Sequence, residues 1–445
     1  MAQQIIEKIK DAGVIGAGGA GFPSHVKLSA QAEVVVVNGA ECEPLLRVDQ
    51  QLMVVEAEKM VQGLEYALAV TGAKEGVIAL KAKYKEAVKT LEQVIAGKDK
   101  LKIYILDDCY PAGDEQVTLY ESTGRLVPQG GIPLKAGAVV TNVETLINIC
   151  NAQEGIPVTD TYLTMCGAVP NPITVKVPVG ITVREAFALA GAKNFNGYGI
   201  IDGGPMMGHL LEDAESPVVK AAKGYILLPE EHRLIANRRL SMETISHRAK
   251  TACIQCRFCT DLCPRYLLGH EIEPHKIMRA LKYSQFNEET IRMAFTCSEC
   301  GMCEQYSCIA GLSPRTVNAN LKRMLSANGI KPLDPPDPQE VHFNRKDRKI
   351  PTKRLISRLE LKHYDVKAPL SDEEFVFDKV TLPLRQHIGA PSVPVVTAGQ
   401  AVNKGDLVAK IPDNALGANI HASISGVVAK VSDSAIVITR GGVQS

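Results

Sequence analysis

Short apolar runs alternate with longer amphipathic segments in the first part of the chain. The pattern predicts three strands with two helices between them, at 33–37, 52–70, 76–80, 84–95 and 102–106. Strands that are apolar on both faces indicate a parallel sheet covered by helices on both sides. Ligands of such sheets bind beyond the carboxyl ends of the strands, so we expect binding loops after Val37 and Leu106. The first segment is therefore predicted to be a Rossmann-like α/β domain.

An amphipathic helix is predicted before this sheet, over Gln3–Asp11. The segment does not have the pattern of a signal peptide. Because the helix runs straight into a glycine-rich loop, we expect Ile5, Ile6 and Ile9 to pack on the α/β domain rather than to form a targeting signal for cargo.

The pattern changes again along the rest of the chain. Short strands rich in Gly and Pro, with one helix, indicate a small α+β domain at 155–230, and the residues at 231–328 are helical in pattern. A linker and a basic strap follow at 329–385, and short strands punctuated by glycine indicate an all-β module at 386–445. The linker prolines are Pro332, Pro335, Pro336 and Pro338. The fold class is multidomain α/β plus α+β.

The overall charge is close to zero, with 50 Lys and Arg against 49 Asp and Glu in 445 residues. Such a chain has no overall attraction to nucleic acid or to an anionic membrane. No apolar run approaches the roughly 18 residues that read as a transmembrane helix, so we expect a soluble, intracellular protein. A basic run from Arg345 to Arg358 is interpreted as a solvated surface, with a docking patch for an acidic carrier protein as the alternative.

Eight of the 12 cysteines fall between Cys253 and Cys308. In an intracellular chain this indicates metal or redox chemistry rather than disulfides. The first run is C-x2-C-x2-C-x3-C followed by proline, the spacing of bacterial ferredoxins, and the second is C-x2-C-x2-C-x4-C. The predicted metal ligands are Cys253, Cys256, Cys259, Cys263, Cys297, Cys300, Cys303 and Cys308.

These two runs predict two [4Fe–4S] clusters. In two-cluster ferredoxins the fourth cysteine of a run binds the other cluster, so we expect Cys308 to complete the first site and Cys263 the second. Two zinc sites are the alternative, but the repeated triplets leave too many thiolates for them. Clusters carry single electrons, and a two-electron donor such as NADH needs a flavin between itself and the clusters.

The other cysteines are isolated and are expected to be buried thiols, as free cysteines usually are. They are Cys42, Cys109, Cys150 and Cys166. His270 and His275 flank the first cysteine run, and we expect them to cap helices or to be solvated rather than to bind metal.

A G-x-G-x-x-G motif lies at Gly16–Gly21. The strand that precedes this motif in dinucleotide-binding folds is missing, because a helix precedes it here. What remains is a loop whose backbone N–H groups can approach a phosphate, with a tightly packed turn as the alternative. The loops Asn38–Pro44 and Tyr110–Glu115 lie at the ligand edge of the predicted sheet. Three loops at one edge favour a nucleotide site.

Several motifs occur together in this chain. They are GAGGAGFPSHVK at 16–27, NGAECEP at 38–44, YPAGDE at 110–115, TNVETL at 141–146 and GGPMMG at 203–208. The combination resembles the flavin- and NADH-binding subunit of respiratory complex I and its relative RnfC. The order of parts resembles the cobalamin reductases of propanediol-utilising microcompartments, the PduS type, in which a barrel-sandwich module follows the flavin domain instead of preceding it. The resemblance covers essentially the whole chain.

The resemblance implies FMN and NADH sites in residues 1–150. The implied contacts are Gly16, Gly18, Gly19, Gly21 and Lys27 near the FMN phosphate; Asn38, Tyr110, Asn142 and Thr145 at the flavin; Glu41, Glu43, Gly113, Asp114 and Glu115 around flavin and nicotinamide; and Phe22 on the NADH adenine. Ala17 and Ala40 stand where the complex I motif has Arg and Asp. The flavin site therefore keeps its glycine frame and loses two polar contacts.

The resemblance also gives the other domains their implied identities. They are a soluble-ligand-binding β-grasp (SLBB) domain at 155–230, a helical domain with two clusters at 231–328, and a barrel sandwich without a modified lysine at 386–445. The implied activity is an NADH-dependent reduction of cobalamin that reactivates the B12 cofactor of a diol dehydratase. The implied location is a bacterial microcompartment, with a shell protein or an adenosyltransferase as partner and with oligomers allowed. The chain lacks D-x-H-x-x-G, so cobalamin is expected to meet a surface.

Two other functions stay open. One is an RnfC-like module that passes electrons between NADH and a ferredoxin or a membrane complex. The other is a non-catalytic electron-transfer scaffold that docks to a shell protein, which the two departures Ala17 and Ala40 keep open.

Overall fold

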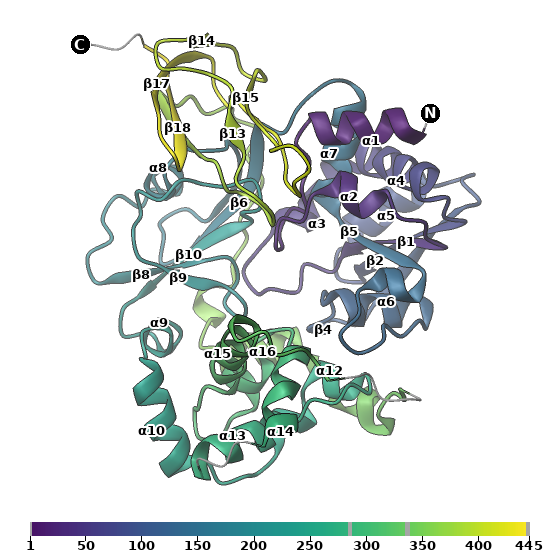
Figure 1. Ribbon diagram of the computed structural model, residues 1–445, viewed down its shortest axis with the longest axis vertical. Coiled ribbons are helices and arrows are strands. Elements are labelled where there is room, and N and C mark those ends of the chain that lie inside the picture. Colours follow the sequence, from purple (N-terminus) through teal and green to yellow (C-terminus); the bar gives the residue numbers. More distant parts are fainter. Residues whose placement is uncertain (1, 284–286, 334–338, 442–445) are drawn as a thin grey trace.

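The N-terminal domain is built on a four-stranded parallel sheet in the order β3-β2-β1-β5 (Figure 1). The computed structural model describes residues 2–283, 287–333 and 339–441. The strands are β1 (Val34–Gly39), β2 (Glu75–Lys81), β3 (Leu101–Leu106) and β5 (Ala138–Asn142). The three predicted strands are confirmed, and β5 is a fourth that the apolar pattern did not reveal.

Helices cover both faces of this sheet. They are α1 (Ala2–Asp11), α2 (Ser24–Leu28), α3 (Val48–Val55), α4 (Ala57–Thr71), α5 (Lys85–Val94), α6 (Glu115–Thr123) and α7 (Val143–Gln153), with a 3-10 turn η1 (Pro133–Ala136). Val35 and Val37 of β1 pack into one core, and Val34 and Val36 pack into the other, on the side of α6. The single helix predicted at 52–70 is two helices that meet at Glu56.

Helix α1 packs on its own domain, as predicted. Ile5 is 7% exposed and Ile9 is fully buried, while Ile6 packs against the same core from a partly buried position. The apolar face of this helix is therefore already covered by the domain that follows it.

The SLBB domain and the C-terminal module share one hydrophobic core. The first has a mixed sheet of β6 (Asp160–Gly167), β7 (Ile173–Pro178), β8 (Tyr198–Asp202), β9 (His209–Leu211) and β10 (Gly224–Pro229) beside α8 (Val183–Leu189). The second has two sheets built from β12 (Lys379–Pro383), β13 (Val393–Pro394), β14 (Ala401–Val402), β15 (Leu407–Lys410), β16 (Ile420–His421), β17 (Gly426–Val431) and β18 (Ala435–Thr439). Val175 and Phe187 of the SLBB domain lie in the same cluster as Leu382 and Val408. Strand β12 begins at Lys379, whereas the sequence predicted that this module starts at residue 386.

The cluster domain consists of short helices around the two cysteine runs. They are α9 (Arg233–Arg238), α10 (Met242–Ala252), α11 (Phe258–Asp261), α12 (Pro264–Leu267), α13 (Pro274–Tyr283), α14 (Glu288–Arg292) and α15 (Pro314–Ala327), with a 3-10 turn η2 (Met293–Thr296) and a π-helical turn η3 (Met302–Ser307). A small core that includes Ile245, Ile277 and Val317 holds α10, α13 and α15 together.

A strap runs from the cysteine-rich helical domain back to the N-terminal domain. It contains η4 (Phe343–Arg348), β11 (Ile350–Pro351), α16 (Thr352–Arg358) and η5 (Lys362–Tyr364), and β11 pairs with β4 (Cys109–Tyr110). Arg345 and Lys349 bind Glu121 of α6 at 2.6 and 2.9 Å. The interpretation of the basic run as a solvated surface is therefore wrong for these two residues, because they hold the strap in place. Pro335, Pro336 and Pro338 lie outside the described residues.

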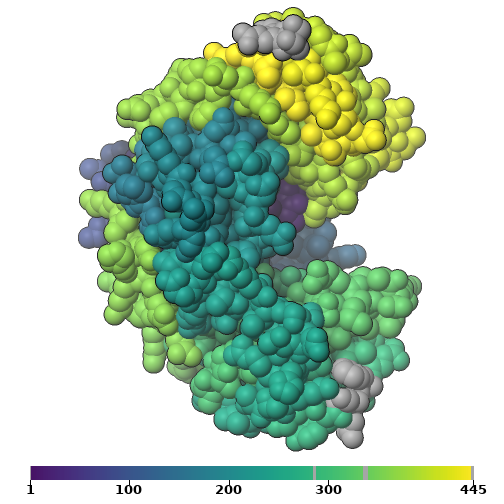
Figure 2. All heavy atoms as spheres, turned by 90° about the vertical axis from the view of Figure 1, so that its left-hand side faces the viewer, coloured from purple at the N-terminus to yellow at the C-terminus, as the bar shows by residue number. Residues whose placement is uncertain are grey.

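The molecular surface is hollowed between the C-terminal module and the cluster domain. Figure 2 shows this hollow between yellow and green atoms, with purple atoms of the N-terminal domain at its base. Within the three described ranges, no helix is both long and apolar enough to cross a bilayer.

Candidate flavin cavity and iron–sulfur sites

A cavity of about 520 Å³ lies at the carboxyl ends of β1 and β5, within the size range of cofactor sites. The three loops that the sequence placed at this edge do line it. Every implied flavin and nicotinamide contact lies in its wall except Glu41 and Glu43, namely Gly16, Gly18, Gly19, Gly21, Phe22, Lys27, Asn38, Tyr110, Gly113, Asp114, Glu115, Asn142 and Thr145.

The wall of this cavity fits FMN. A Cβ atom on Gly19 would meet no atom within 4 Å, so the backbone faces open space there. Lys27 supplies a positive charge for a phosphate and is paired with Glu115 at 2.9 Å. The ring of Phe22 is 37% exposed in the wall and offers a face for stacking. The cavity thus combines bare backbone, a cation and an aromatic ring, which is the set a flavin nucleotide needs.

In the first half of the glycine loop, the backbone N–H groups form hydrogen bonds within the protein. The N–H of Ala17 donates to the Thr145 hydroxyl at 2.9 Å, and the N–H of Gly16 donates to the carbonyl of Phe22. The N–H of Gly18 donates to the carbonyl of Ala221 in the SLBB domain. The N–H groups of Gly16, Ala17 and Gly18 are therefore already used within the protein, whereas the sequence implied that the whole loop faces a phosphate.

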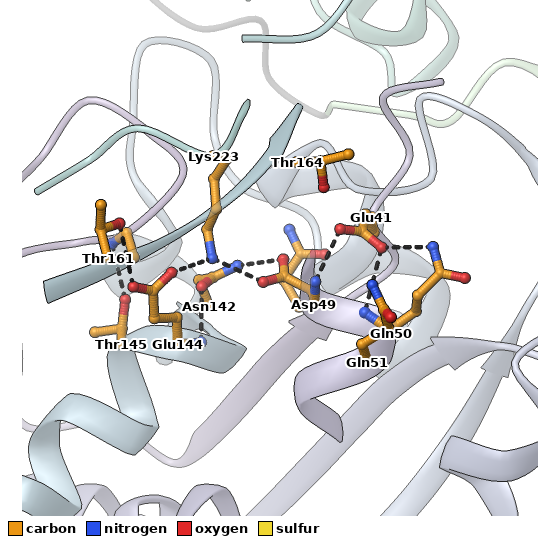
Figure 3. A network of polar contacts seen from close by, with 12 residues as sticks. Glu41, Asp49, Gln50, Gln51, Asn142, Glu144, Thr145, Thr161, Thr164 and Lys223 are labelled. Carbon is orange, nitrogen blue, oxygen red and sulfur yellow. Dashed lines mark hydrogen bonds and ion pairs between the residues drawn. The ribbon is translucent and has the colours of Figure 1, made fainter. Parts of the chain in front are cut away.

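A buried lysine from the SLBB domain, Lys223, packs against the glycine loop and forms ion pairs with two carboxylates (Figure 3). The Lys223 ammonium lies 2.9 Å from Asp49 and 2.6 Å from Glu144. Burial alone would lower its pKa, but these two carboxylates outweigh burial and raise it. Asn142 donates to Asp49 at 2.7 Å and caps α7. A Cβ on Gly18 would lie 2.8 Å from the Lys223 side chain, so this position requires glycine.

Glu41 and Glu43 lie outside the cavity wall, in contrast to the implied contacts. The Glu41 carboxylate accepts the N–H groups of Asp49 and Gln50 and therefore caps the start of α3 (Figure 3). The Glu43 carboxylate accepts the N–H groups of Met206 and Met207 in the SLBB domain. Burial raises the pKa of both carboxyl groups, and the N–H donors oppose that rise. Both glutamates connect segments of the protein.

The cavity extends to the second cysteine run. Ser298 and Cys300 line it, and the Tyr110 hydroxyl donates to the Cys300 carbonyl at 2.5 Å. On the same side, Asp114 forms a buried ion pair with Arg265, two residues after Cys263. Tyr110 of the YPAGDE motif therefore bonds to the backbone of Cys300, and Asp114 of the same motif bonds to a residue close to Cys263. Sequence reasoning missed Arg265 and Ser298 because neither belongs to a nucleotide-binding motif.

The cysteines gather in the two groups that were predicted. A small cavity is lined by Cys253, Cys256, Cys259 and Cys308, and Cys256 is exposed to solvent. Burial, together with these three neighbouring thiols, raises the pKa of Cys259 to about 12. In the other group, burial and neighbouring Cys297 raise the pKa of Cys263 to about 12, and Cys263 likewise raises that of Cys300. We call the first group the outer site and the second (Cys263, Cys297, Cys300 and Cys303) the inner site.

The two cysteine groups are not arranged to hold a single metal ion. Among the described residues, no three or more His, Cys, Asp or Glu side chains stand close enough to hold one metal ion. In a [4Fe–4S] cluster the thiolates bind an iron–sulfur cage rather than one shared ion. The two groups of four cysteines are the donor set that such clusters use.

The predictions for the isolated cysteines and for the two histidines that flank the first cysteine run are only partly confirmed. Cys150 and Cys166 are buried as predicted, whereas Cys109 is partly buried and Cys42 lines the flavin cavity. His270 is 4% exposed, and among the described residues neither of its ring nitrogens has a hydrogen-bond partner, so the expectation that it caps a helix or is solvated is wrong. Burial lowers its pKa to about 4. His275 lies at the outer site and shares a 2.8 Å hydrogen bond with Thr260.

Four family models match successive parts of the chain. They are a Nuo51 FMN-binding domain at 9–151, an SLBB domain at 162–209, a 4Fe-4S dicluster domain at 252–313 and an RnfC barrel sandwich hybrid domain at 356–444. The first and third contain the cavity and the two cysteine groups. The matches confirm the predicted fold class and the predicted cofactors, FMN and two [4Fe–4S] clusters.

Curated relatives match over nearly the full length. Cobalamin reductases PduS of Citrobacter freundii and of Salmonella typhimurium are 47% and 48% identical to this chain, each covering 99% of it and 97% of the relative. A component of the Na(+)-translocating ferredoxin:NAD(+) oxidoreductase complex of Acetobacterium woodii is 35% identical over 60% of this chain and 59% of the relative. The chain therefore belongs to the PduS family of cobalamin reductases.

Proposed function

We propose that this chain reduces cobalamin with electrons from NADH, through FMN and two [4Fe–4S] clusters. The observation that carries the proposal is a shared wall: Gly19 of the flavin cavity and Cys300 of the inner site line the same cavity. The flavin and one cluster would therefore be neighbours. The name of the two relatives that match over nearly the full length supports cobalamin as the acceptor.

The order of the electron carriers follows from the contacts. Tyr110 and Asp114 of the flavin domain reach the surroundings of Cys300 and Cys263, so the inner site comes first. The outer site comes second, and its exposed Cys256 gives an acceptor access from solvent. When bound, FMN would supply the hydride chemistry that NADH requires, and the clusters would carry single electrons. One NADH supplies two electrons and releases one proton, which is enough for two one-electron reductions of cob(II)alamin.

The chain's own residues would bind and orient the cofactors. Lys27 and the backbone from Gly19 onward would hold the FMN phosphate, and Asn38 and Thr145 would contact the flavin. Phe22 would stack on the adenine of NADH. Glu115 is paired with Lys27 and would keep that ammonium oriented toward the cavity. These assignments rest on the lining of the cavity and on the resemblance of the motifs.

Anaerobic purification and spectroscopy test this function. Oxidised-flavin absorption that NADH bleaches, followed by loss of cluster absorption and reduction of added cob(II)alamin, is the expected sequence. Cluster absorption without flavin would contradict the proposal and would favour the non-catalytic scaffold. The measurement needs only the whole chain, NADH and cobalamin.

A second function has support from one observation. The 35% identity to a component of a ferredoxin:NAD(+) oxidoreductase complex favours an RnfC-like module that exchanges electrons with a ferredoxin. The same reduced protein should then reduce ferredoxin faster than cobalamin. A direct comparison of the two acceptors distinguishes these functions.

The setting of the proposed reaction is a bacterial microcompartment. The names of the relatives support this location, because the family resemblance connects PduS proteins with propanediol use in such compartments. A shell protein or an adenosyltransferase would be the partner there. Co-purification of this chain with intact compartments tests the location.

A further inference from the structure

We propose that the segment Gly203–Gly208 of the SLBB domain fixes the flavin cavity against the inner cluster site, and that Glu43 is the positioning residue that anchors this segment. We call the segment the junction loop. The inference rests on the proposed function, because it concerns the electron step between those two sites. It assigns a role to a domain that contributes only Met207 of this loop to the wall of the flavin cavity.

Glu43 holds the loop with both carboxylate oxygens. Its Oε2 accepts the N–H of Met206 at 2.9 Å, and its Oε1 accepts the N–H of Met207 at 3.0 Å. Hydrogen bonds to a carboxylate are among the stronger ones in proteins. A Cβ on Gly204 would lie 2.0 Å from Oε2, so the loop can approach Glu43 this closely only with glycine at that position.

The loop and Glu43 also contact the turn that carries a cluster ligand. The Tyr110 hydroxyl lies 3.4 Å from Oε1 of Glu43 and donates to the Cys300 carbonyl at 2.5 Å. A Cβ on Gly301 would lie 2.7 Å from the Met206 carbonyl, so the turn after Cys300 is packed directly on the loop. Met207 reaches the flavin cavity from the same loop. One short segment thus touches both redox sites.

Two arginines hold the loop from the other side. Arg238 of α9 donates to the carbonyls of Pro205 and Gly208 at 2.7 and 3.0 Å. Arg315 of α15 donates to the Met207 carbonyl at 2.9 Å. Helix α15 packs in the core of the cluster domain, whereas α9 packs against β8 and β9 of the SLBB domain, so the loop is tied to the flavin domain by Glu43 and to the cluster domain by Arg315. The N–H groups of Met206 and Met207 bond to the flavin domain, and the Met207 carbonyl bonds to the cluster domain.

Such contacts act on the cluster through its ligand. Groups that hydrogen-bond to or position a ligand tune the potential of a metal site. The separation of two redox groups depends on the segments that join them, and small displacements of reacting groups carry large rate effects. The step concerned is the passage of single electrons from the flavin site to the inner site, with NADH as the source of the pair and cobalamin as the sink.

The variant Glu43→Gln tests the anchor in the whole chain with its cofactors. The amide keeps one acceptor oxygen and turns an NH₂ group toward a backbone N–H, so one of the two bonds is lost. We expect cluster reduction after mixing with NADH to be about tenfold slower, while the flavin is reduced at the parental rate. Amide hydrogen exchange at Met206 and Met207 should be faster, also in the cofactor-free protein.

Tyr110→Phe gives a second readout and Tyr84→Phe is its matched control. Loss of the bond to the Cys300 carbonyl should shift the midpoint potential of the inner cluster, measured by EPR during a redox titration. The Tyr84 hydroxyl is also buried and donates to the carbonyls of Ala40 and Glu41, but within the described part of the chain it makes no hydrogen bond to a cluster ligand or its neighbours. Tyr84→Phe should therefore leave that potential unchanged.

Two results would overturn the inference. One is a Glu43→Gln variant in which both the rate of cluster reduction and the rate of amide exchange equal those of the parent. The other is an inner cluster with the same midpoint potential in Tyr110→Phe as in Tyr84→Phe. If Glu43→Gln does not fold, the tyrosine pair decides the question alone. A parent protein whose flavin NADH does not reduce would instead contradict the proposed function, so the two failures are distinguishable.

Discussion

Single residues decide whether the cavity can accept a flavin, and Gly19 is the clearest of them. Its missing side chain faces open space, and its backbone does not require a positive φ. A valine would therefore fit the fold and project into the cavity. We expect Gly19→Val to lose FMN while both clusters and the melting temperature stay at parental values. Flavin and iron assays on the purified variant check this, and retained flavin would place FMN elsewhere.

The exposed ligand Cys256 tests how the cysteines are shared between two clusters. It belongs to the outer site, whereas the inner site is assembled from four other thiols. Cys256→Ala should therefore remove about half the iron and spare the inner cluster. Iron analysis combined with EPR measures both quantities. Iron content equal to that of the parent would contradict the assignment of this residue to a cluster.

The sequence revealed site residues where a motif carries them and missed those that a distant segment supplies. The glycine loop and the YPAGDE motif line the cavity as implied. Lys223 and Arg265 come from other domains, and a buried charge whose partners are remote leaves no local signal. The cap that Glu41 forms on α3 was not predicted either, because it depends on how the loop after β1 turns back toward the start of that helix.

At the scale of elements, periodicity predicted long strands and helices better than short ones. Strands β1, β2 and β3 stand between long helical segments and were predicted. Strand β5 is only five residues long and runs directly into α7, so its apolar run gave no separate signal. The break between α3 and α4 at Glu56 was also missed, since the apolar positions continue through it.

The strap is an element whose attachment can be tested. Glu121 binds both Arg345 and Lys349, and the Arg345 side chain is only 10% exposed. Removing one partner of a buried ion pair leaves an uncompensated charge, which costs about 3 kcal/mol. We expect Glu121→Gln to lower the free energy of unfolding by that amount and to speed proteolysis of the strap at 343–358.

A surface pair provides the control for the strap. Glu75 binds Lys102 at 2.7 Å, but both side chains are about half exposed. Exposed pairs contribute at most about 1 kcal/mol, so Glu75→Gln should change the free energy of unfolding little. If the two variants unfold alike in urea, Glu121 does not anchor the strap.

At the scale of the whole molecule, three domains meet at Lys220. Its ammonium donates to the carbonyls of Gly13 and Asn419 at 2.9 and 2.7 Å, from the N-terminal domain and the C-terminal module. Burial lowers its pKa to about 7. His387 and His421 lie nearby, and burial and the charge of Lys220 lower their pKa values. These two histidines therefore titrate at a lower pH than Lys220 does.

This junction predicts a pH dependence of stability. Between pH 7 and about 10 the unfolded chain keeps the Lys220 proton and the native chain does not, so stability rises with pH, by up to about 1.4 kcal/mol per unit. We expect the melting temperature of the parent to rise over this range relative to Lys220→Met. Parallel pH profiles for the two proteins would contradict the lowered pKa.

The close packing of Gly13 against Asn419 also bears on how such chains are assembled in evolution. A Cβ on Gly13 would lie 2.2 Å from the Asn419 carbonyl, and the Asn419 side chain donates to the carbonyl of Asp11, the last residue of α1, at 3.4 Å. The C-terminal barrel sandwich is therefore packed beside the first helix. A gene that carried this module in front of the flavin domain could place it against the same surface through a linker. Domain order and spatial arrangement are separable here, so a circular permutant joined in this way is expected to fold.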